Sequence, residues 1–166
     1  MNLSKKLLLT CLVSASFFSS FSWAQGVTVY TQSRLLAAER QQQAGQLDKA
    51  IETLTSTKAK ANYDQAFVAR MLGIYYWEKG DANQSIASLQ KALDLKVLDQ
   101  EASWQTCRML ADVLYSEQKS NQAIKEYQAL LGQTYRPQTA SARTQYQAAV
   151  NQVYFRLAAA FYQKQD

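Results

Sequence analysis

The sequence predicts an all-α protein built from stacked helical hairpins. After about residue 30, apolar residues recur with the 3.6-residue period of an amphipathic helix, and no alternating run of β-branched residues competes with it. The composition suits helices, because 48% of the 166 residues are hydrophobic, 19% are charged and only one is Pro. A residue pattern also recurs along the chain, and helical hairpins bury their apolar faces by stacking on copies of themselves. We expect one domain at this length.

The first 24 residues have the organisation of a signal peptide. Lys5 and Lys6 form a positive n-region, residues 7–18 supply an apolar stretch, and Ser22 and Ala24 are the small residues required before a cleavage site. We expect cleavage after Ala24 and release of residues 25–166 into the periplasm, with no stable membrane insertion. An uncleaved anchor is the alternative, but twelve apolar-leaning residues fall short of the roughly 20 in a spanning helix.

Charge and cysteine content narrow the classes of partner. Without Lys5 and Lys6, 16 basic and 13 acidic residues remain, a net charge of +3. That charge is mild, and no basic run with interleaved aromatic residues is present, so we expect no nucleic-acid partner. Cys11 lies in a segment that resembles a lipoprotein box, but only four residues separate it from Lys6, too few for an h-region. Cys107 is then alone in the mature chain and forms no internal disulfide.

The clearest helical hairpin is predicted at residues 66–78 and 82–95. Gly80 lies between the two helices and can adopt the left-handed conformation that ends the first of them. Asp81, with Gln84 three residues later, can cap the second helix.

The pattern of this hairpin recurs 38 positions later and, more weakly, 35 positions earlier. About 47 positions beyond the third copy, only the first half of the pattern recurs. The predicted repeats are residues 31–61, 66–98 and 104–133, with a terminal helix at 143–164 and a break at Pro137. Small residues at equivalent places let helix backbones approach closely, and bulky apolar residues fill the space around them. The predicted packing residues are Leu72, Gly73, Tyr76, Ser85, Leu89, Ala92, Leu110, Ala111, Ala123, Tyr127, Leu157 and Ala158.

This arrangement resembles the tetratricopeptide repeat, which has Leu-Gly, Tyr, Gly, Ala and an aromatic residue in this order over about 34 residues. The resemblance covers roughly residues 30–164 and implies a solenoid of about three and a half hairpins. Residues 63–73 and 108–112 also resemble small exported repeat proteins encoded beside TonB, ExbB and ExbD in Gram-negative bacteria. That likeness implies a periplasmic protein-binding scaffold or adaptor, accessory to a TonB-type energy-transduction or envelope-assembly complex.

Catalysis finds no support in the sequence. The chain has no His, which removes the commonest general base and zinc ligand. Cys107 falls on the inner side of a predicted first helix, where a small apolar residue packs. Acidic residues lack the spacing of a calcium loop, and no Gly-rich phosphate loop is present. We therefore expect no enzyme activity, no cofactor and no metal site.

Tetratricopeptide repeats bind partners on the concave face formed by their first helices, and the resemblance projects which side chains line it. Arginine beside aromatic residues is typical of protein-binding hot spots, and such a face suits a peptide with an acidic group. The alternative is that these aromatic residues only pack against neighbouring repeats. The predicted partner-binding residues are Phe67, Arg70, Ile74, Trp77, Arg108, Asp112, Tyr115, Phe155 and Tyr162.

A second hypothesis is self-association without a peptide groove. Phe155, Phe161 and Tyr162 belong to the last predicted helix, and a short solenoid without a polar cap can stack such residues against another copy. The product would be a homodimeric structural protein of the envelope.

Overall fold

The computed structural model describes residues 26–133 and 135–164, so the predicted signal peptide lies outside the described residues. All regular structure in this part of the chain is helical, as the sequence predicts, and none of its helices is long and apolar enough to cross a membrane. The helices are α2 (Val29–Gln43), α3 (Leu47–Thr55), α4 (Asn62–Lys79), α5 (Ala82–Asp94), α6 (Gln100–Ser116), α7 (Ser120–Leu131) and α8 (Ala140–Gln163).

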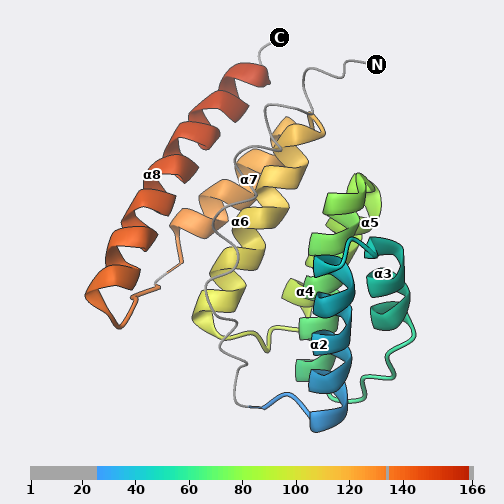
Figure 1. Cartoon of the computed structure of the whole chain (residues 1–166). Coiled ribbons are helices and arrows are strands. Elements are labelled where there is room, and N and C mark those ends of the chain that lie inside the picture. The colour runs from blue at the N-terminus through green and yellow to red at the C-terminus, as the bar shows by residue number, and fades with distance from the viewer. Residues whose placement is uncertain (1–25, 134, 165–166) are drawn as a thin grey trace.

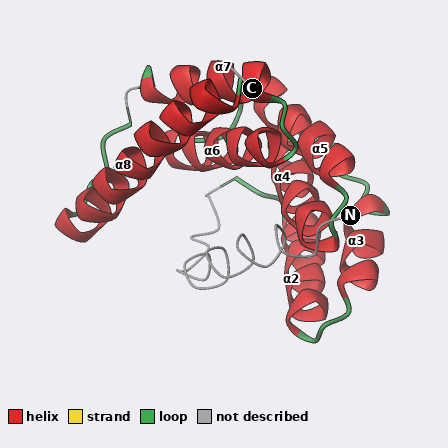
Figure 2. Cartoon of the chain, turned by 90° about the horizontal axis from the view of Figure 1, so that it is seen from above, coloured by secondary structure: helices red, strands yellow, loops and turns green. Residues whose placement is uncertain are grey.

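Consecutive helices pair into antiparallel hairpins, α2 with α3, α4 with α5 and α6 with α7, and α8 packs chiefly on α7 (Figure 1). Seen from above, the helices follow an arc (Figure 2). Helices α2, α4 and α6 lie on the inner side of the arc, and α3, α5 and α7 lie on the outer side. The first helix of each hairpin therefore contributes one strip of the inner surface.

The three hairpin turns are closed by the same backbone hydrogen bond. In each turn an N–H donates to the carbonyl five residues earlier, the longer-range bond of a Schellman-type helix ending. The donors are separated by 35 and 38 residues, the offsets at which the sequence pattern recurs. The three bonds are Gln46 to Gln41 (2.8 Å), Asp81 to Tyr76 (2.8 Å) and Lys119 to Leu114 (2.9 Å).

The residue before each of these donors lies in the left-handed region, with φ of 74° at Gly45, 85° at Gly80 and 59° at Gln118. The predicted left-handed ending at Gly80 is confirmed. So is the predicted cap, because the backbone N–H of Gln84 donates to the Asp81 carboxylate at 3.0 Å.

Helices α6 and α8 begin earlier in the chain than the sequence pattern predicts. Helix α6 starts at Gln100 because the Asp99 carboxylate accepts the Ala102 N–H at 2.8 Å. Helix α8 starts at Ala140 because the Thr139 hydroxyl accepts the Ala142 N–H at 3.1 Å. Apolar periodicity does not detect these first turns, since capping depends on one polar side chain.

The hairpins close on pairs of small residues. In α4 and α5, the Ser85 hydroxyl donates to the Gly73 carbonyl at 2.7 Å, and a Cβ added at Gly73 would lie 2.6 Å from the Leu89 side chain. In α6 and α7, Ala111 and Ala123 are fully buried. Gly73 thus allows α4 and α5 to pack at a short distance that any larger residue would increase.

The apolar core has two parts. The first joins α2, α3 and α4, and the second joins α5, α6, α7 and α8. Among the predicted packing residues, Leu72, Tyr76 and Leu157 are half-buried, and Gly73, Ser85, Leu89, Ala92, Leu110, Ala111, Ala123 and Tyr127 are buried.

Ala158 corrects the sequence prediction, because it is exposed instead of packed between helices. The equivalent residues Gly73 and Ala111 are covered by α5 and α7, whereas no described helix covers this side of α8.

Candidate functional site on the inner face

Two of the predicted partner-binding residues, Phe67 and Arg70, lie in the packing between helices. Phe67 is buried in the first core, with its ring centre 5.0 Å from that of Tyr63. Arg70 is 7% exposed. The structure therefore corrects the expectation that both present an open surface, because their side chains fill the junctions of α4 with its neighbours.

Arg70 links two hairpins. Its Nε donates to the Thr106 hydroxyl at 3.0 Å, and its Nη2 donates to Gln105 Oε1 at 2.8 Å, so a side chain of α4 binds two residues of α6. Burial lowers the pKa of the Arg70 guanidinium, and the carboxylates of Asp99 and Glu101 oppose that shift. The position is structural in this arrangement.

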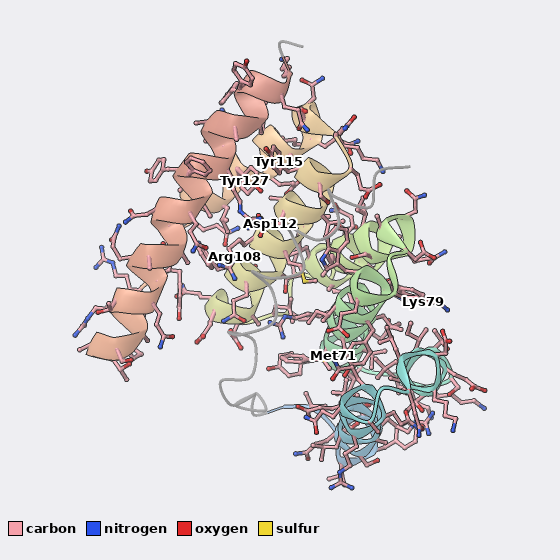
Figure 3. The ribbon with its side chains drawn as sticks, turned by 45° about the horizontal axis from the view of Figure 1, so that its top comes forward. Met71, Lys79, Arg108, Asp112, Tyr115 and Tyr127 are labelled. Carbon is pink, nitrogen blue, oxygen red and sulfur yellow. The ribbon has the colours of Figure 1, made fainter. Side chains whose placement is uncertain are left out.

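Arg108 holds the same place on α6 as Arg70 on α4 but differs in its surroundings. The side chain is half-buried, and its guanidinium carbon lies 5.6 Å from the centre of the Trp104 ring, in cation–π contact. Burial lowers its pKa, and Asp112 partly offsets this effect. Within the described residues, no carboxylate lies within ion-pair distance of this guanidinium and no acceptor receives its hydrogen bonds. Figure 3 shows Arg108, Asp112 and Tyr115 in succession along α6.

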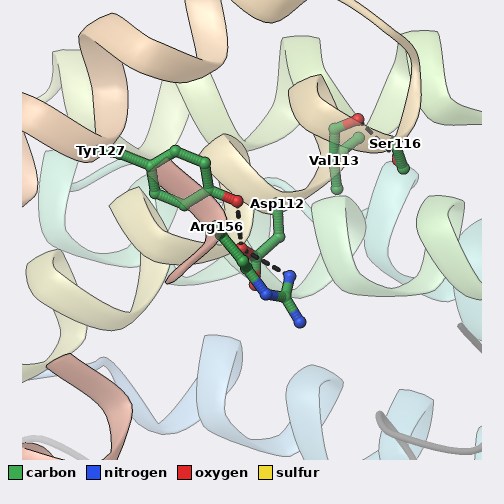
Figure 4. A network of polar contacts seen from close by, with 5 residues as sticks. All are labelled: Asp112, Val113, Ser116, Tyr127 and Arg156. Carbon is green, nitrogen blue, oxygen red and sulfur yellow. Dashed lines mark hydrogen bonds and ion pairs between the residues drawn. The ribbon is translucent and has the colours of Figure 1, made fainter. Parts of the chain in front are cut away.

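Asp112 is the centre of a polar network that joins three helices (Figure 4). Its Oδ1 accepts the Tyr127 hydroxyl of α7 and the Arg156 guanidinium of α8, both at 2.7 Å. Burial and the Asp112 carboxylate raise the pKa of Tyr127. Burial alone would lower the pKa of Arg156, but Asp112 and Tyr127 outweigh it and raise that pKa. The negative charge of Asp112 is therefore already paired within the chain.

The three other predicted residues of α4 and α6 are half-buried. Ile74 packs at the edge of the first core, and Trp77 and Tyr115 pack at the edge of the second. Each side chain thus contributes to packing while part of it stays open to solvent. Both interpretations of the aromatic residues, packing and contact with a partner, are compatible with this position.

Phe155 and Tyr162 lie on the last helix, α8. They are 77% and 70% exposed on α8, on a face that none of the described helices covers. Both side chains are thus open to solvent, and they hold the repeat positions of Arg108 and Tyr115 on α6.

Sequence reasoning missed Trp104 and Arg156. Trp104 precedes Arg108 by four residues, the spacing at which side chains meet on a helix, so the pair could have been found from that spacing. Arg156 stands where the earlier copies have Met71 and Met109. A charge at an otherwise apolar repeat position was the available signal for an ion pair between helices.

The environment of Cys107 disfavours a reactive thiol. Cys107 is buried, and burial together with Glu126 raises the pKa of its thiol to about 12, so the thiolate form is disfavoured. Among residues 26–133 and 135–164, no three His, Cys, Asp or Glu side chains gather as metal ligands.

No protein-family model matches this chain, and no curated protein is significantly similar to it.

Proposed function

We propose that this protein is a scaffold whose inner face binds an acidic segment of another protein. The binding surface, called here the inner-face patch, consists of Ile74, Trp77, Arg108, Asp112 and Tyr115. The observation that carries the proposal is the half-buried Arg108 guanidinium, which has lost part of its water without gaining a carboxylate within the described chain. A charge in that position gains most from an anionic ligand.

The charge balance of the patch favours the same ligand. Within the patch, Arg108 is positive and Asp112 is negative, but Arg156, which lies outside the patch on α8, already pairs the Asp112 charge. The surplus is positive and lies beside Trp104, whose ring holds the Arg108 side chain in place. An ordered guanidinium loses less entropy when it binds a carboxylate in bidentate fashion.

The remaining members of the patch suit a peptide. Trp77 and Tyr115 are partly packed, so their orientation is fixed by the core, and partly exposed, so they can still be covered. Rigid aromatic residues around a charged anchor are typical of interaction hot spots. The expected ligand is an extended or helical segment with an acidic residue opposite Arg108 and apolar residues on either side.

The repeating unit that forms this surface is proposed to be a tetratricopeptide-like repeat. The matching backbone turns at 35- and 38-residue offsets, and the small-residue contacts at Gly73 and Ala111, support a solenoid of this type. First helices on the inner side of the arc are what partner binding on a concave face requires (Figure 2).

The proposed compartment is the periplasm, as residues 1–24 suggest, and the proposed partner is a subunit of a TonB-type or envelope-assembly complex. The support for this partner is the likeness of residues 63–73 and 108–112 to small exported repeat proteins, so it is a narrower hypothesis than peptide binding itself.

Charge reversal at Arg108 tests the scaffold proposal. Immobilised mature protein, residues 25–166, is incubated with envelope extract, and captured proteins are identified by mass spectrometry. Arg108→Glu is expected to lower capture of the specific partner at least tenfold, because a repelling charge replaces the anchor. Arg136→Glu is the matched control, since Arg136 is exposed in the turn before α8 and carries the same change of charge.

Circular dichroism must show equal helicity for both variants. Capture by Arg108→Glu at the level of the wild type and of Arg136→Glu would contradict the proposal. Arg70→Glu is unsuitable as a test, because Arg70 holds α4 to α6 and its reversal would disturb the fold.

A further inference from the structure

The outward face of α8 is apolar and uncovered. Tyr154 is 58% exposed, Phe155 77%, Phe161 42% and Tyr162 70%, and Ala158 between them is also exposed. Most large hydrophobic side chains of the described chain are at least half-buried, so this cluster is unusual. We call it the α8 face.

The repeat explains why this face is apolar. On α4 and α6, the positions that face the preceding hairpin are buried, and so are those that face the following helices. On α8, only the positions that face the preceding hairpin are buried. Val68, Thr106 and Val153 are equivalent and buried, as are Tyr75, Val113 and Ala160.

At the positions that face the following helices, Ala69 and Cys107 are buried, whereas the equivalent Tyr154 is exposed. Likewise Gly73 and Ala111 are buried, whereas Ala158 is exposed. The α8 face thus has the composition of a helix–helix contact, with a small residue where two backbones approach, and among the described residues nothing occupies the other side.

We infer that a second copy of this chain covers the α8 face, with two α8 helices crossing antiparallel at Ala158. The residues are arranged symmetrically about this position. Tyr154 and Phe155 lie four and three residues before it, and Phe161 and Tyr162 lie three and four residues after it. A twofold axis through the paired Ala158 residues therefore sets the first aromatic pair of one helix against the second pair of its partner.

Charge supports a self-complementary contact. Between residues 144 and 162 the only charged residue is Arg156, and it turns inward to Asp112. A second copy consequently brings no like charges together along the crossing. The Ala158 residues of the two copies would pack against each other at the axis and become buried, as Ala111 is within the hairpin of α6 and α7.

The area is sufficient for a weak specific dimer. With aromatic side chains of roughly 200 Å² each, the four exposed fractions offer about 500 Å² per copy, or about 1,000 Å² in the pair, near the lower limit for a specific interface. We expect an equilibrium between monomer and dimer in the micromolar range.

Sedimentation equilibrium of mature protein from about 1 to 500 μM tests the association. The wild type is expected to shift from monomer to dimer across this range, and Ala158→Glu to remain monomeric with unchanged helicity. Val29→Glu is the control, because Val29 is 82% exposed on α2 at the other end of the arc. A wild type that stays monomeric throughout would overturn the inference, and so would a dimer lost in Val29→Glu but kept in Ala158→Glu.

Disulfide trapping tests the geometry independently of a charge introduced into the face. With Ala158→Cys the two new thiols lie on the axis, so mild oxidation is expected to crosslink most of the dimer. Gln147→Cys places a thiol on the same exposed side of α8 but about three turns from the axis, and no crosslinking is expected. Equal crosslinking of both variants, or crosslinking of Gln147→Cys alone, would contradict the antiparallel crossing.

Discussion

At the scale of single residues, the three hairpin turns place one residue each in the left-handed region. Gly45 and Gly80 adopt this conformation without steric cost, but Gln118 has a Cβ that meets the neighbouring carbonyl. The hydrogen bonds that close the turns at Gly80 and Gln118 are otherwise the same. Gln118 is therefore a strained position that the surrounding helices impose.

Gln118→Gly is expected to stabilise the protein. Removing the strained Cβ outweighs the added freedom of the unfolded chain by about 1 kcal/mol, or roughly 3 °C in Tm. Thermal unfolding followed by circular dichroism measures the change. Gly80→Gln is the reciprocal variant and should lower Tm by a similar amount. A lower Tm for Gln118→Gly would show that the turn is not strained.

At the scale of elements, the hairpin of α4 and α5 depends on one close contact. Gly73 lies against Leu89, and the Ser85 hydroxyl satisfies the Gly73 carbonyl as a second acceptor bond. The two parts of the core meet at this hairpin, because α4 contributes to the first and α5 to the second. A wider spacing here would loosen both.

Gly73→Ala is expected to destabilise the protein by about 1–3 kcal/mol, the usual cost of overpacking a core, although alanine has the better helix propensity. Urea unfolding measures this loss. Gly132→Ala is the matched control, since Gly132 has a negative φ and a Cβ there would meet its nearest atom at 3.5 Å. Similar effects of the two substitutions would contradict the close contact.

At the scale of the whole molecule, Arg70 connects the hairpin of α4 and α5 to that of α6 and α7 through Gln105 and Thr106. Arg34 offers a comparison, because it donates to the Thr53 carbonyl and the Ser56 hydroxyl within the first hairpin only. One arginine binds between hairpins and the other within a hairpin.

Arg70→Met is expected to uncouple the two halves of the arc. The junction loses hydrogen bonds worth on the order of 1–3 kcal/mol, while the apolar volume is largely kept. Native-state hydrogen exchange in urea measures this change. The exchange free energies of amides in α4 and α6 are expected to depend on urea in the same way in the wild type, and in two different ways in Arg70→Met. Arg34→Met should speed exchange in α2 and α3 and leave α4 and α6 together. A shared dependence in Arg70→Met would argue against coupling through this residue.

Much of the local structure was predictable from the sequence. Apolar periodicity places the helices, Gly80 and Asp81 place a turn and a cap, and the repeat pattern identifies the small residues at close contacts. The helix starts that follow the N-cap residues Asp99 and Thr139 were missed, because a cap depends on a single side chain that periodicity does not weigh. Arg156 was missed because its partner, Asp112, is 44 positions away in the sequence.

By itself, the sequence determined that this protein is helical and built from repeats. The helical period of its apolar residues and the recurrence of its residue pattern follow from local chemistry and spacing alone. Only the tertiary structure decided which equivalent residues are open. Arg70 and Arg108 hold the same repeat position, yet one is enclosed by the next helix and the other retains an open guanidinium face. Ala158 and Ala111 differ in the same way. Exposure depends on neighbours brought close by folding, and a repeat pattern assigns every copy the same neighbours.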